Sequence, residues 1–340
     1  MPRSTLIPGA KRNPLERGGS LRGGPAPHLR AENSTRGIML DMLIVLSPML
    51  LISVFFYGFR SLTLTLTSVA ACIAFEWLYE RLLKKPITTS DLSAAVTGVL
   101  LAYSLPASVP YWIPVVGAAF AILIVKQLYG GIGKNFLNPA LAGKAFLLIC
   151  YPDIMQGWTE PFQHLPIVGQ VTAELAMNPL ESLKDGILPV DTARELLLGR
   201  HAGALGETCA LLILICGAVL ILRGVIRPRI PLYYLGTVAA LTFFFPLGGA
   251  HPVDWMLAEL LSGSLMLAAV FMATDYTTSP VTTLGQTVYA IGCGLMTVFL
   301  RYFGGWIEAT CFAILIMNTC VWAIDRIRLP RRPKGGARNA

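Results

Sequence analysis

The sequence predicts an all-α integral membrane protein of ten transmembrane helices, arranged as two five-helix inverted repeats (5+5) with short or broken half-helices. Three observations predict this class. Of the 340 residues, 54% are hydrophobic and only 14% are charged, whereas a soluble domain has roughly a quarter charged residues. Ten apolar stretches follow one another along the chain, and one long polar insertion separates the first five from the last five. This composition excludes a soluble globular enzyme and a disordered chain.

The apolar stretches define the expected helices. A helix that crosses the hydrocarbon core needs about 20 residues at 1.5 Å each. Several stretches are shorter, and the fifth would cross about half of a bilayer, so we expect broken and half-helices. The expected spans are 42–59, 62–78, 92–105, 111–125, 139–151, 208–222, 231–248, 253–272, 284–300 and 306–324.

Charge placement predicts the orientation and the domains. Most of the 27 lysines and arginines lie in the N-terminal arm, in alternate loops and in the C-terminal tail. The positive-inside rule therefore places both termini in the cytoplasm, and membrane lipid rather than nucleic acid is the expected partner of the basic surface. The few basic residues expected on the outer side are Arg60, Lys184, Arg194, Arg200 and Arg301. The expected domains are a flexible arm (1–37), a first repeat (38–151), an external loop (152–206), a second repeat (207–325) and a basic tail (326–340).

Cysteine and histidine patterns argue against bound metal. The seven cysteines lie within or at the edges of apolar stretches and form no Cys-x-x-Cys pair, and the four histidines are scattered. We therefore expect no disulfide framework, iron–sulfur cluster or metal site. The sequence contains no pattern of catalytic side chains either.

The run 126–141 contains the most informative local signals. Three glycines within four positions end a helix, and Asn138 followed by Pro139 is typical of a helix start. A half-helix is therefore expected from Pro139, and its positive end suits an anionic group or a carbonyl oxygen. Lys144 follows as a buried cation that needs a partner, for which Glu308 is the candidate. The pair belongs either to an ion pathway or to a structural bridge.

A second polar run, 272–282, separates the eighth and ninth expected spans. Its hydroxyl-bearing side chains and its one carboxylate include Thr274, Asp275 and Thr278. These groups could hydrogen-bond a flavin or quinone ring, or coordinate a cation through oxygen atoms. A capped turn without a ligand is the alternative.

Weak internal similarity predicts the inverted repeat. The run 129–131 (Tyr-Gly-Gly) has a counterpart in 303–305 (Phe-Gly-Gly), and 97–98 (Thr-Gly) has one in 262–263 (Ser-Gly). Transporters with such repeats place their sites where helices break near the membrane midplane. Two unrelated helical hairpins that share glycines are the alternative.

Five segments carry a resemblance to a known family. Residues 27–30, 126–141, 205–208, 272–282 and 303–305 resemble the RnfD component of the Rnf complex, which is closely related to the NqrB component of the sodium-pumping NADH:quinone reductase. The resemblance extends from about residue 27 to residue 328. It implies a ten-helix inverted repeat and a membrane component of an oxidoreductase complex. That complex couples electron transfer between reduced ferredoxin and NAD to Na⁺ or H⁺ translocation across the bacterial inner membrane.

The resemblance also implies partners. Neither a dinucleotide-binding glycine motif nor a cysteine cluster occurs in this chain, so it holds no complete active site. The expected partners are the other Rnf subunits, namely the iron–sulfur, NADH-binding, membrane and covalent-flavin subunits. The alternatives are NqrB of the quinone reductase, whose members tend to have longer N-terminal arms, and a stand-alone channel or transporter of the same fold.

The cofactor implied by the resemblance is FMN, and here the sequence departs from the family pattern. Many members bear FMN on a threonine of the external loop through a phosphoester, but Asn178 occupies that position. An amide cannot form this bond, and the residues around Thr172 do not restore the pattern. We therefore expect FMN to be non-covalent or absent, with attachment to Thr172 as the less favoured alternative and a second flavin as a further possibility. The expected cofactor-binding residues are Asn178, Thr172, Asn135, Asn138, Lys126, Thr274, Asp275 and Thr278.

Overall fold

The regular elements of the structure, a computed structural model that describes residues 34–167, 176–207 and 209–327, are all helical. In the first half they are α1 (Thr35–Tyr57), α2 (Phe59–Leu82), the 3₁₀ turn η2 (Thr89–Asp91), α3 (Ser93–Tyr103), α4 (Trp112–Ala119), the π-helix η3 (Phe120–Gln127) and α5 (Pro139–Cys150). Helices α2 and α3 pack closely at Gly98, where a Cβ atom would lie 2.7 Å from the Cα atom of Val69. This close contact explains why α3 carries a glycine in mid-helix.

The polar insertion contains α6 (Pro152–Met155), α7 (Pro179–Lys184) and α8 (Ala193–Leu198) and then enters the protein core. Leu205 N donates to Leu105 O at 3.0 Å, and Gly206 N donates to Tyr103 O at 2.8 Å. A Cβ atom on Gly206 would lie 2.3 Å from that of Tyr103, so only glycine fits. The end of the expected external loop is therefore buried, because its apolar residues pack against the first half.

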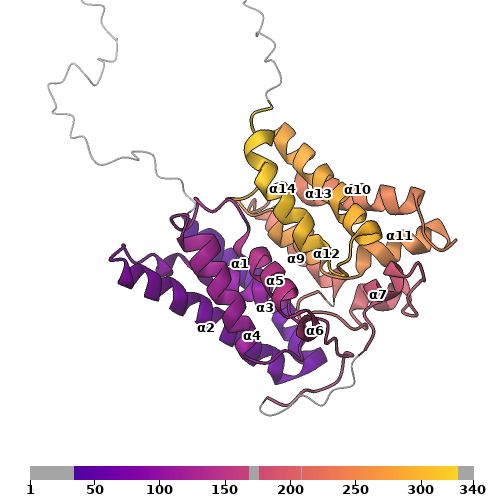
Figure 1. Ribbon diagram of the computed structural model, residues 1–340, viewed down its shortest axis with the longest axis horizontal. Coiled ribbons are helices and arrows are strands. Elements are labelled where there is room, and N and C mark those ends of the chain that lie inside the picture. The colour runs from indigo at the N-terminus through magenta and orange to yellow at the C-terminus, as the bar shows by residue number, and fades with distance from the viewer. Residues whose placement is uncertain (1–33, 168–175, 208, 328–340) are drawn as a thin grey trace, which may run out of the picture. The chain divides into compact units, whose positions relative to one another are not determined.

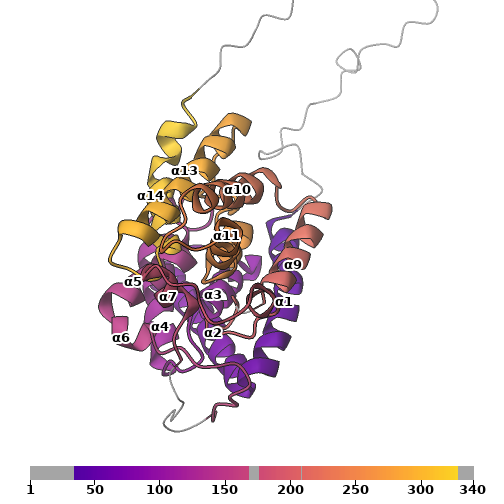
Figure 2. The same cartoon turned by 90° about the vertical axis from the view of Figure 1, so that its right-hand side faces the viewer.

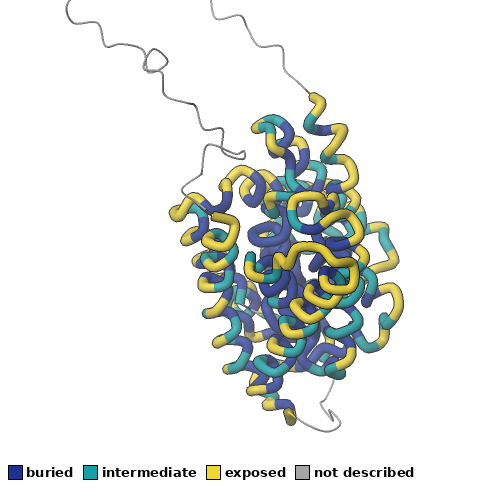
Figure 3. Tube along the Cα trace, turned by 90° about the vertical axis from the view of Figure 1, so that its left-hand side faces the viewer, coloured by how far each residue is buried: buried dark blue, intermediate teal, exposed yellow. Residues whose placement is uncertain are grey.

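The second half contains α9 (Ala210–Leu222), α10 (Arg229–Phe244), α11 (Pro252–Leu261), α12 (Leu265–Leu267), the π-helix η4 (Ala268–Met272), α13 (Thr283–Phe303) and α14 (Thr310–Ile324). The two halves lie side by side, with the first drawn in indigo and magenta and the second in orange and yellow (Figure 1). They meet where α1 packs against α9 and where α5 packs against α14. Buried residues gather on the helix faces that point inward (Figure 3).

All ten expected spans coincide with a helix or a bent pair of helices. Among the described residues, three helices are long and apolar enough to cross a membrane, namely α1, α2 and α13. The bent pair of α11 with α12–η4, which turns by 66° at its break, would be a fourth span. Large apolar side chains such as Leu51 and Phe244 are 71% and 72% exposed on the outside, as suits contact with lipid. The described part of the chain is thus all-helical and contains several apolar helices, as expected of a membrane protein.

Two basic residues expected on the outer side are buried in the structure. Arg60 is 2% exposed and donates to the carbonyl oxygens of Ala107 and Val109 at 3.0 Å each. Arg301 lies in the last turn of α13 and is 6% exposed. Both guanidinium groups donate hydrogen bonds to backbone carbonyl oxygens near helix ends. A count of the charges in the loops of the sequence does not reveal these contacts.

The expected repeat pairs differ locally. Residues 97–98 lie inside the continuous helix α3, whereas 262–263 break the chain between α11 and α12, and Gly263 has a φ of +69° there. The likeness of these two dipeptides is therefore one of sequence and not of local structure. The packing of Gly98 against α2 keeps the helix continuous in the first half.

Candidate functional site

The predicted half-helix begins at Pro139. Gly130, Gly131 and Gly133 have φ values of +108°, +88° and +84°, so the chain leaves the helical conformation as expected. The Asn138 side-chain oxygen then accepts hydrogen bonds from Ala140 N at 3.0 Å and Leu141 N at 3.2 Å. Asn138 is the N-cap of α5 and Pro139 is its first residue, which confirms this prediction.

Asn138 also joins the two halves of the chain. Its Nδ2 atom donates to the carbonyl oxygen of Met272 at 3.0 Å. Met272 is the last residue of π-helix η4, and π-helix η3 in the first half contains Lys126. Each π-helix therefore leads into one of the two polar runs, and π-helical turns in proteins often occur at functional sites.

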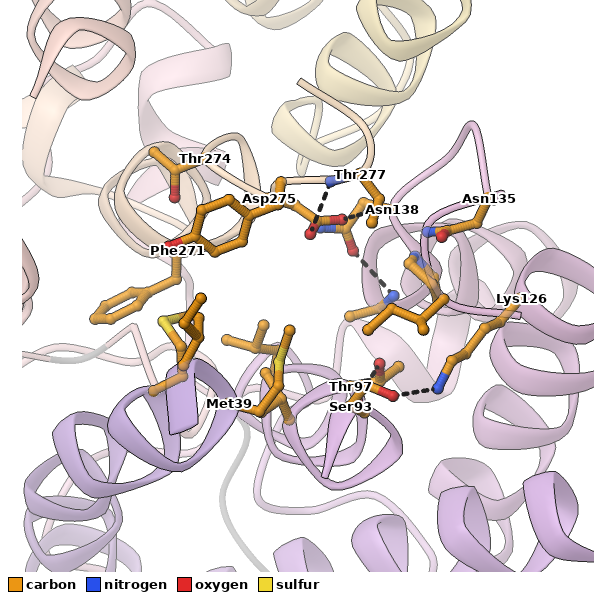
Figure 4. Close-up of a pocket in the computed structure, with 18 of the residues that line it drawn as sticks. Met39, Ser93, Thr97, Lys126, Asn135, Asn138, Phe271, Thr274, Asp275 and Thr277 are labelled. Carbon is orange, nitrogen blue, oxygen red and sulfur yellow. Dashed lines mark hydrogen bonds between the residues drawn. The ribbon is translucent and has the colours of Figure 1, made fainter. Parts of the chain in front are cut away.

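A cavity of about 360 Å³ lies where the two polar runs meet. Ile38, Met39 and Phe271 give it an apolar side, and Ser93 and Thr97 contribute hydroxyl groups. Figure 4 shows side chains from both halves that point into this space. A mostly apolar cavity with a few polar groups on one side is typical of a small-molecule site.

Five of the expected cofactor-binding residues line this cavity, namely Lys126, Asn135, Asn138, Thr274 and Asp275. Thr278 does not line it but donates to the Asp275 carboxylate from behind at 3.3 Å. Asn178, Lys144 and Glu308 lie elsewhere in the structure. Thr172 falls outside the described residues.

Lys126 is held at the cavity wall by a partner that the sequence did not indicate. Its Nζ atom lies 2.6 Å from the Glu76 carboxylate and 2.6 Å from the Ser93 hydroxyl. Gln127 Nε2 donates to the same carboxylate oxygen at 2.8 Å. Glu76 is a buried acid in the apolar helix α2. Because acidic residues in apolar membrane helices usually have a function, the position of Glu76 in the sequence could have identified it as a candidate.

Asp275 lies in a capped turn. Its carboxylate accepts hydrogen bonds from the hydroxyl groups of Thr277 at 2.9 Å and Thr278 at 3.3 Å. The capped turn, which was the alternative to a ligand site, is therefore present. Asp275 and Thr277 also line the cavity. The role of Asp275 in ligand binding therefore stays a prediction, and we add Thr277 as a further candidate residue.

Lys144 and Glu308 form an ion pair, as predicted. Their side chains are 1% and 2% exposed, and Ser264 Oγ donates to the Glu308 carboxylate at 3.2 Å. The pair joins α5 to the segment that precedes α14. The pairing is confirmed, and its place in an ion pathway stays a prediction.

Asn178 acts as a helix cap. Its side-chain oxygen accepts from Leu180 N at 2.9 Å, which starts α7, and the residue is 1% exposed. The amide carries no hydroxyl group and is buried, so a covalent FMN does not fit at this position. The buried amide nitrogen has no hydrogen-bond partner among the described residues.

Metal ligands do not gather in the described part of the chain. No three histidine, cysteine, aspartate or glutamate side chains lie there in an arrangement that could hold a metal ion. The seven cysteines carry no disulfide bond.

The sequence of the whole chain decides its family. Residues 24–334 match the model of the NQR2, RnfD, RnfE family. The chain belongs to this family. It is 43% identical to the D component of the Na⁺-translocating ferredoxin:NAD⁺ oxidoreductase complex of Acetobacterium woodii, over 90% of this chain and 93% of the relative.

Two further relatives carry related names. The D component of the proton-translocating ferredoxin:NAD⁺ oxidoreductase complex of Clostridium ljungdahlii is 35% identical over 90% of this chain and 93% of its own length. The D component of the ion-translocating oxidoreductase complex of Halorhodospira halophila is also 35% identical, with the same coverage. The resemblance to the Rnf family is thus confirmed.

Proposed function

We propose that this chain is the RnfD membrane component of an Rnf-type complex that couples electron transfer between ferredoxin and NAD to the translocation of Na⁺ or H⁺. The observation that carries the proposal is the cavity between Lys126 and Asp275, where the two polar runs of the family resemblance meet. The names of the relatives support the same function. They favour it over NqrB of a quinone reductase and over a stand-alone channel.

The proposed architecture is ten membrane segments in two inverted repeats, with both termini in the cytoplasm. The coincidence of the ten apolar stretches with helices supports the number. The first turn of α1 and the last turn of α14 lie toward the same end of the protein (Figure 2), as an even number of crossings requires. The proposed domains are those given by the sequence, with the first span starting at Thr35.

The proposed cofactor is a non-covalent flavin in the cavity. The apolar side of the cavity, which includes Met39 and Phe271, would lie against its flat ring. The Lys126 ammonium group and the Asn135 amide lie on the polar side and would donate to the ring carbonyls. A flavin there supplies an acceptor for one or two electrons. The protein would contribute binding and orientation.

The proposed partners are the other Rnf subunits. The described residues contain no group of side chains that could hold an iron–sulfur cluster, and the sequence contains no dinucleotide-binding glycine motif. Electrons must therefore enter and leave through subunits that hold those groups. Membrane lipid is the remaining partner.

The test of this function is purification of the complex from its native membrane by a tag on this chain. We expect co-purified subunits that hold iron–sulfur clusters, ferredoxin-dependent NAD reduction, and flavin released from this chain on denaturation. A chain that purifies alone, without flavin, and conducts a solute in vesicles would favour the stand-alone channel. Quinone reduction in place of ferredoxin oxidation would favour the quinone reductase.

A further inference from the structure

A second buried cluster of charges lies apart from the residues that line the cavity. It consists of Lys144 from α5, Glu308 from the segment before α14, and Glu207 from the buried end of the insertion. These residues are 1%, 4% and 2% exposed, respectively. Three distant parts of the sequence therefore bring one ammonium group and two carboxyl groups to one place in the core.

The three groups interact with one another. Lys144 and Glu308 form an ion pair, and Glu207 interacts electrostatically with both of them. The segment around Glu207 is fixed by hydrogen bonds to Tyr103 O and Leu105 O. These backbone hydrogen bonds, together with the one from Ala204 N to the Glu207 carboxylate, hold Glu207 in the core.

Each carboxylate has one oxygen atom without a hydrogen-bond partner among the described residues. Glu207 accepts from Ala204 N at 2.9 Å through Oε1, which leaves Oε2 unpartnered. Glu308 uses Oε2 for Lys144 and Ser264, which leaves Oε1 unpartnered. Buried polar atoms are rarely left in this state, so each calls for an explanation. The Lys144 Nζ atom also makes no hydrogen bond among the described residues, but its charge is paired with Glu308. The two acceptor atoms therefore still suit a ligand that brings positive charge.

The charge count leads to the same conclusion. Two carboxylates and one ammonium group would leave one negative charge in the core, and an unbalanced buried charge is strongly unfavourable. A proton or another monovalent cation restores neutrality.

The neighbouring groups do not supply this positive charge. Arg301 also acts on Glu207, but its guanidinium group lies 2.6 Å from the Glu259 carboxylate and is neutralised there. The other titratable groups that face the cluster are Tyr57 and Cys311, and neither can carry a positive charge. The missing charge must therefore come from outside the chain.

The cluster also lies at a broken helix. Ser264, which contacts Glu308, lies within the 66° break between α11 and α12. The Ser262 hydroxyl at the same break is fully buried and has no hydrogen-bond partner among the described residues. In transporters, coupling ions bind where helices are interrupted.

We propose that the cluster of Glu207, Lys144 and Glu308 binds one monovalent cation, a proton or a sodium ion, at the two unpartnered carboxylate oxygens. The transport role of this site rests on the proposed ion-translocating function, whereas its ability to bind the cation does not. One relative is named as Na⁺-translocating and another as proton-translocating. Their names therefore do not indicate which of the two ions binds to this cluster.

Infrared difference spectroscopy on the purified full complex in sodium-free buffer tests the binding. We expect a carboxylic acid band that Glu207→Gln removes and that Glu207→Asp shifts. Glu160→Gln, which changes an exposed glutamate of the insertion, should leave the band unchanged. If Glu207→Gln does not accumulate in the membrane, the shift of the band in Glu207→Asp still tests the proposal.

Addition of sodium at constant pH separates the two ions. Loss of the band on addition identifies a sodium site, and a band that persists identifies a proton site. Absence of any Glu207-dependent band, together with equal sodium binding by the wild-type complex and Glu207→Gln, would overturn the proposal.

Ion uptake by vesicles tests the transport role separately. Electron transfer that continues without ion uptake in Glu207→Gln would place the site on the pathway. Unchanged uptake together with a Glu207-dependent band would remove the site from the pathway and leave cation binding intact.

Discussion

Lys144 on α5 and Glu308 before α14 form an ion pair that connects the two halves of the chain inside the core. Their side chains are only 1% and 2% exposed. Removal of the ammonium group would take from the buried Glu308 carboxylate its ion-pair partner. Burial makes this loss much more costly than at a surface ion pair.

The first prediction concerns Lys144→Met. We expect the free energy of unfolding to fall by about 3–5 kcal/mol, because an uncompensated buried charge is left behind. Lys144→Met/Glu308→Gln removes both partners and should recover most of the loss. The measurement is denaturant unfolding of the full chain in detergent micelles. Lys134→Met, at an exposed lysine, is the control, and an equally small effect of both single variants would contradict the prediction.

Local signals explain why the half-helix could be predicted. The glycine run, Asn138 and Pro139 act within a few residues of each other, and the structure has the chain break and the helix start where they indicate. The pairing of Lys144 with Glu308 could also be predicted, since a buried cation requires an acid and few acids lie within apolar stretches.

Tertiary contacts explain what the sequence did not reveal. Glu76 and Glu207 lie far in sequence from their partners Lys126 and Lys144, and only the packing of the helices brings them together. The break at Gly263 looks in sequence like the continuous helix at Gly98. The difference depends on what each glycine packs against.

The second prediction compares two asparagines that cap helices. Asn138→Ala and Asn178→Ala should each lower the free energy of unfolding by roughly 0.5–2 kcal/mol through loss of an N-cap. Only Asn138 lines the cavity and bonds to Met272 O. We therefore expect Asn138→Ala alone to lower the flavin content of the purified chain, measured as fluorescence released on denaturation. Equal flavin loss in both variants would contradict a flavin in this cavity.

The third prediction concerns covalent attachment. The buried Asn178 amide caps α7 and offers no hydroxyl group, so we expect no flavin fluorescence from this chain in a denaturing gel. Intact-mass measurement of the chain from its native membrane should give the mass of the unmodified sequence. An added FMN phosphate on a peptide that contains Asn178 or Thr172 would contradict this expectation, and peptide sequencing would identify the acceptor.

The fourth prediction uses His201, which lies in the insertion outside the expected membrane spans. The residue is 3% exposed, and neither ring nitrogen has a hydrogen-bond partner among the described residues. Burial lowers the pKa of His201 from 6.5 to about 4. Between these values the unfolded chain binds a proton that the folded chain does not, so stability is full above pH 6.5 and falls toward pH 4. The loss amounts to about 3 kcal/mol at most.

Hydrogen exchange in the segment around His201, followed from pH 7 to pH 4, measures this loss after correction for the intrinsic exchange rate. His201→Leu should remove the part of the pH dependence that belongs to this side chain, because no ionisable group remains there. His251→Leu is the matched control, since the His251 side chain is 69% exposed. A wild-type profile that matches His201→Leu throughout this range would show that His201 is charged in the folded protein, and that a partner stabilises the charge.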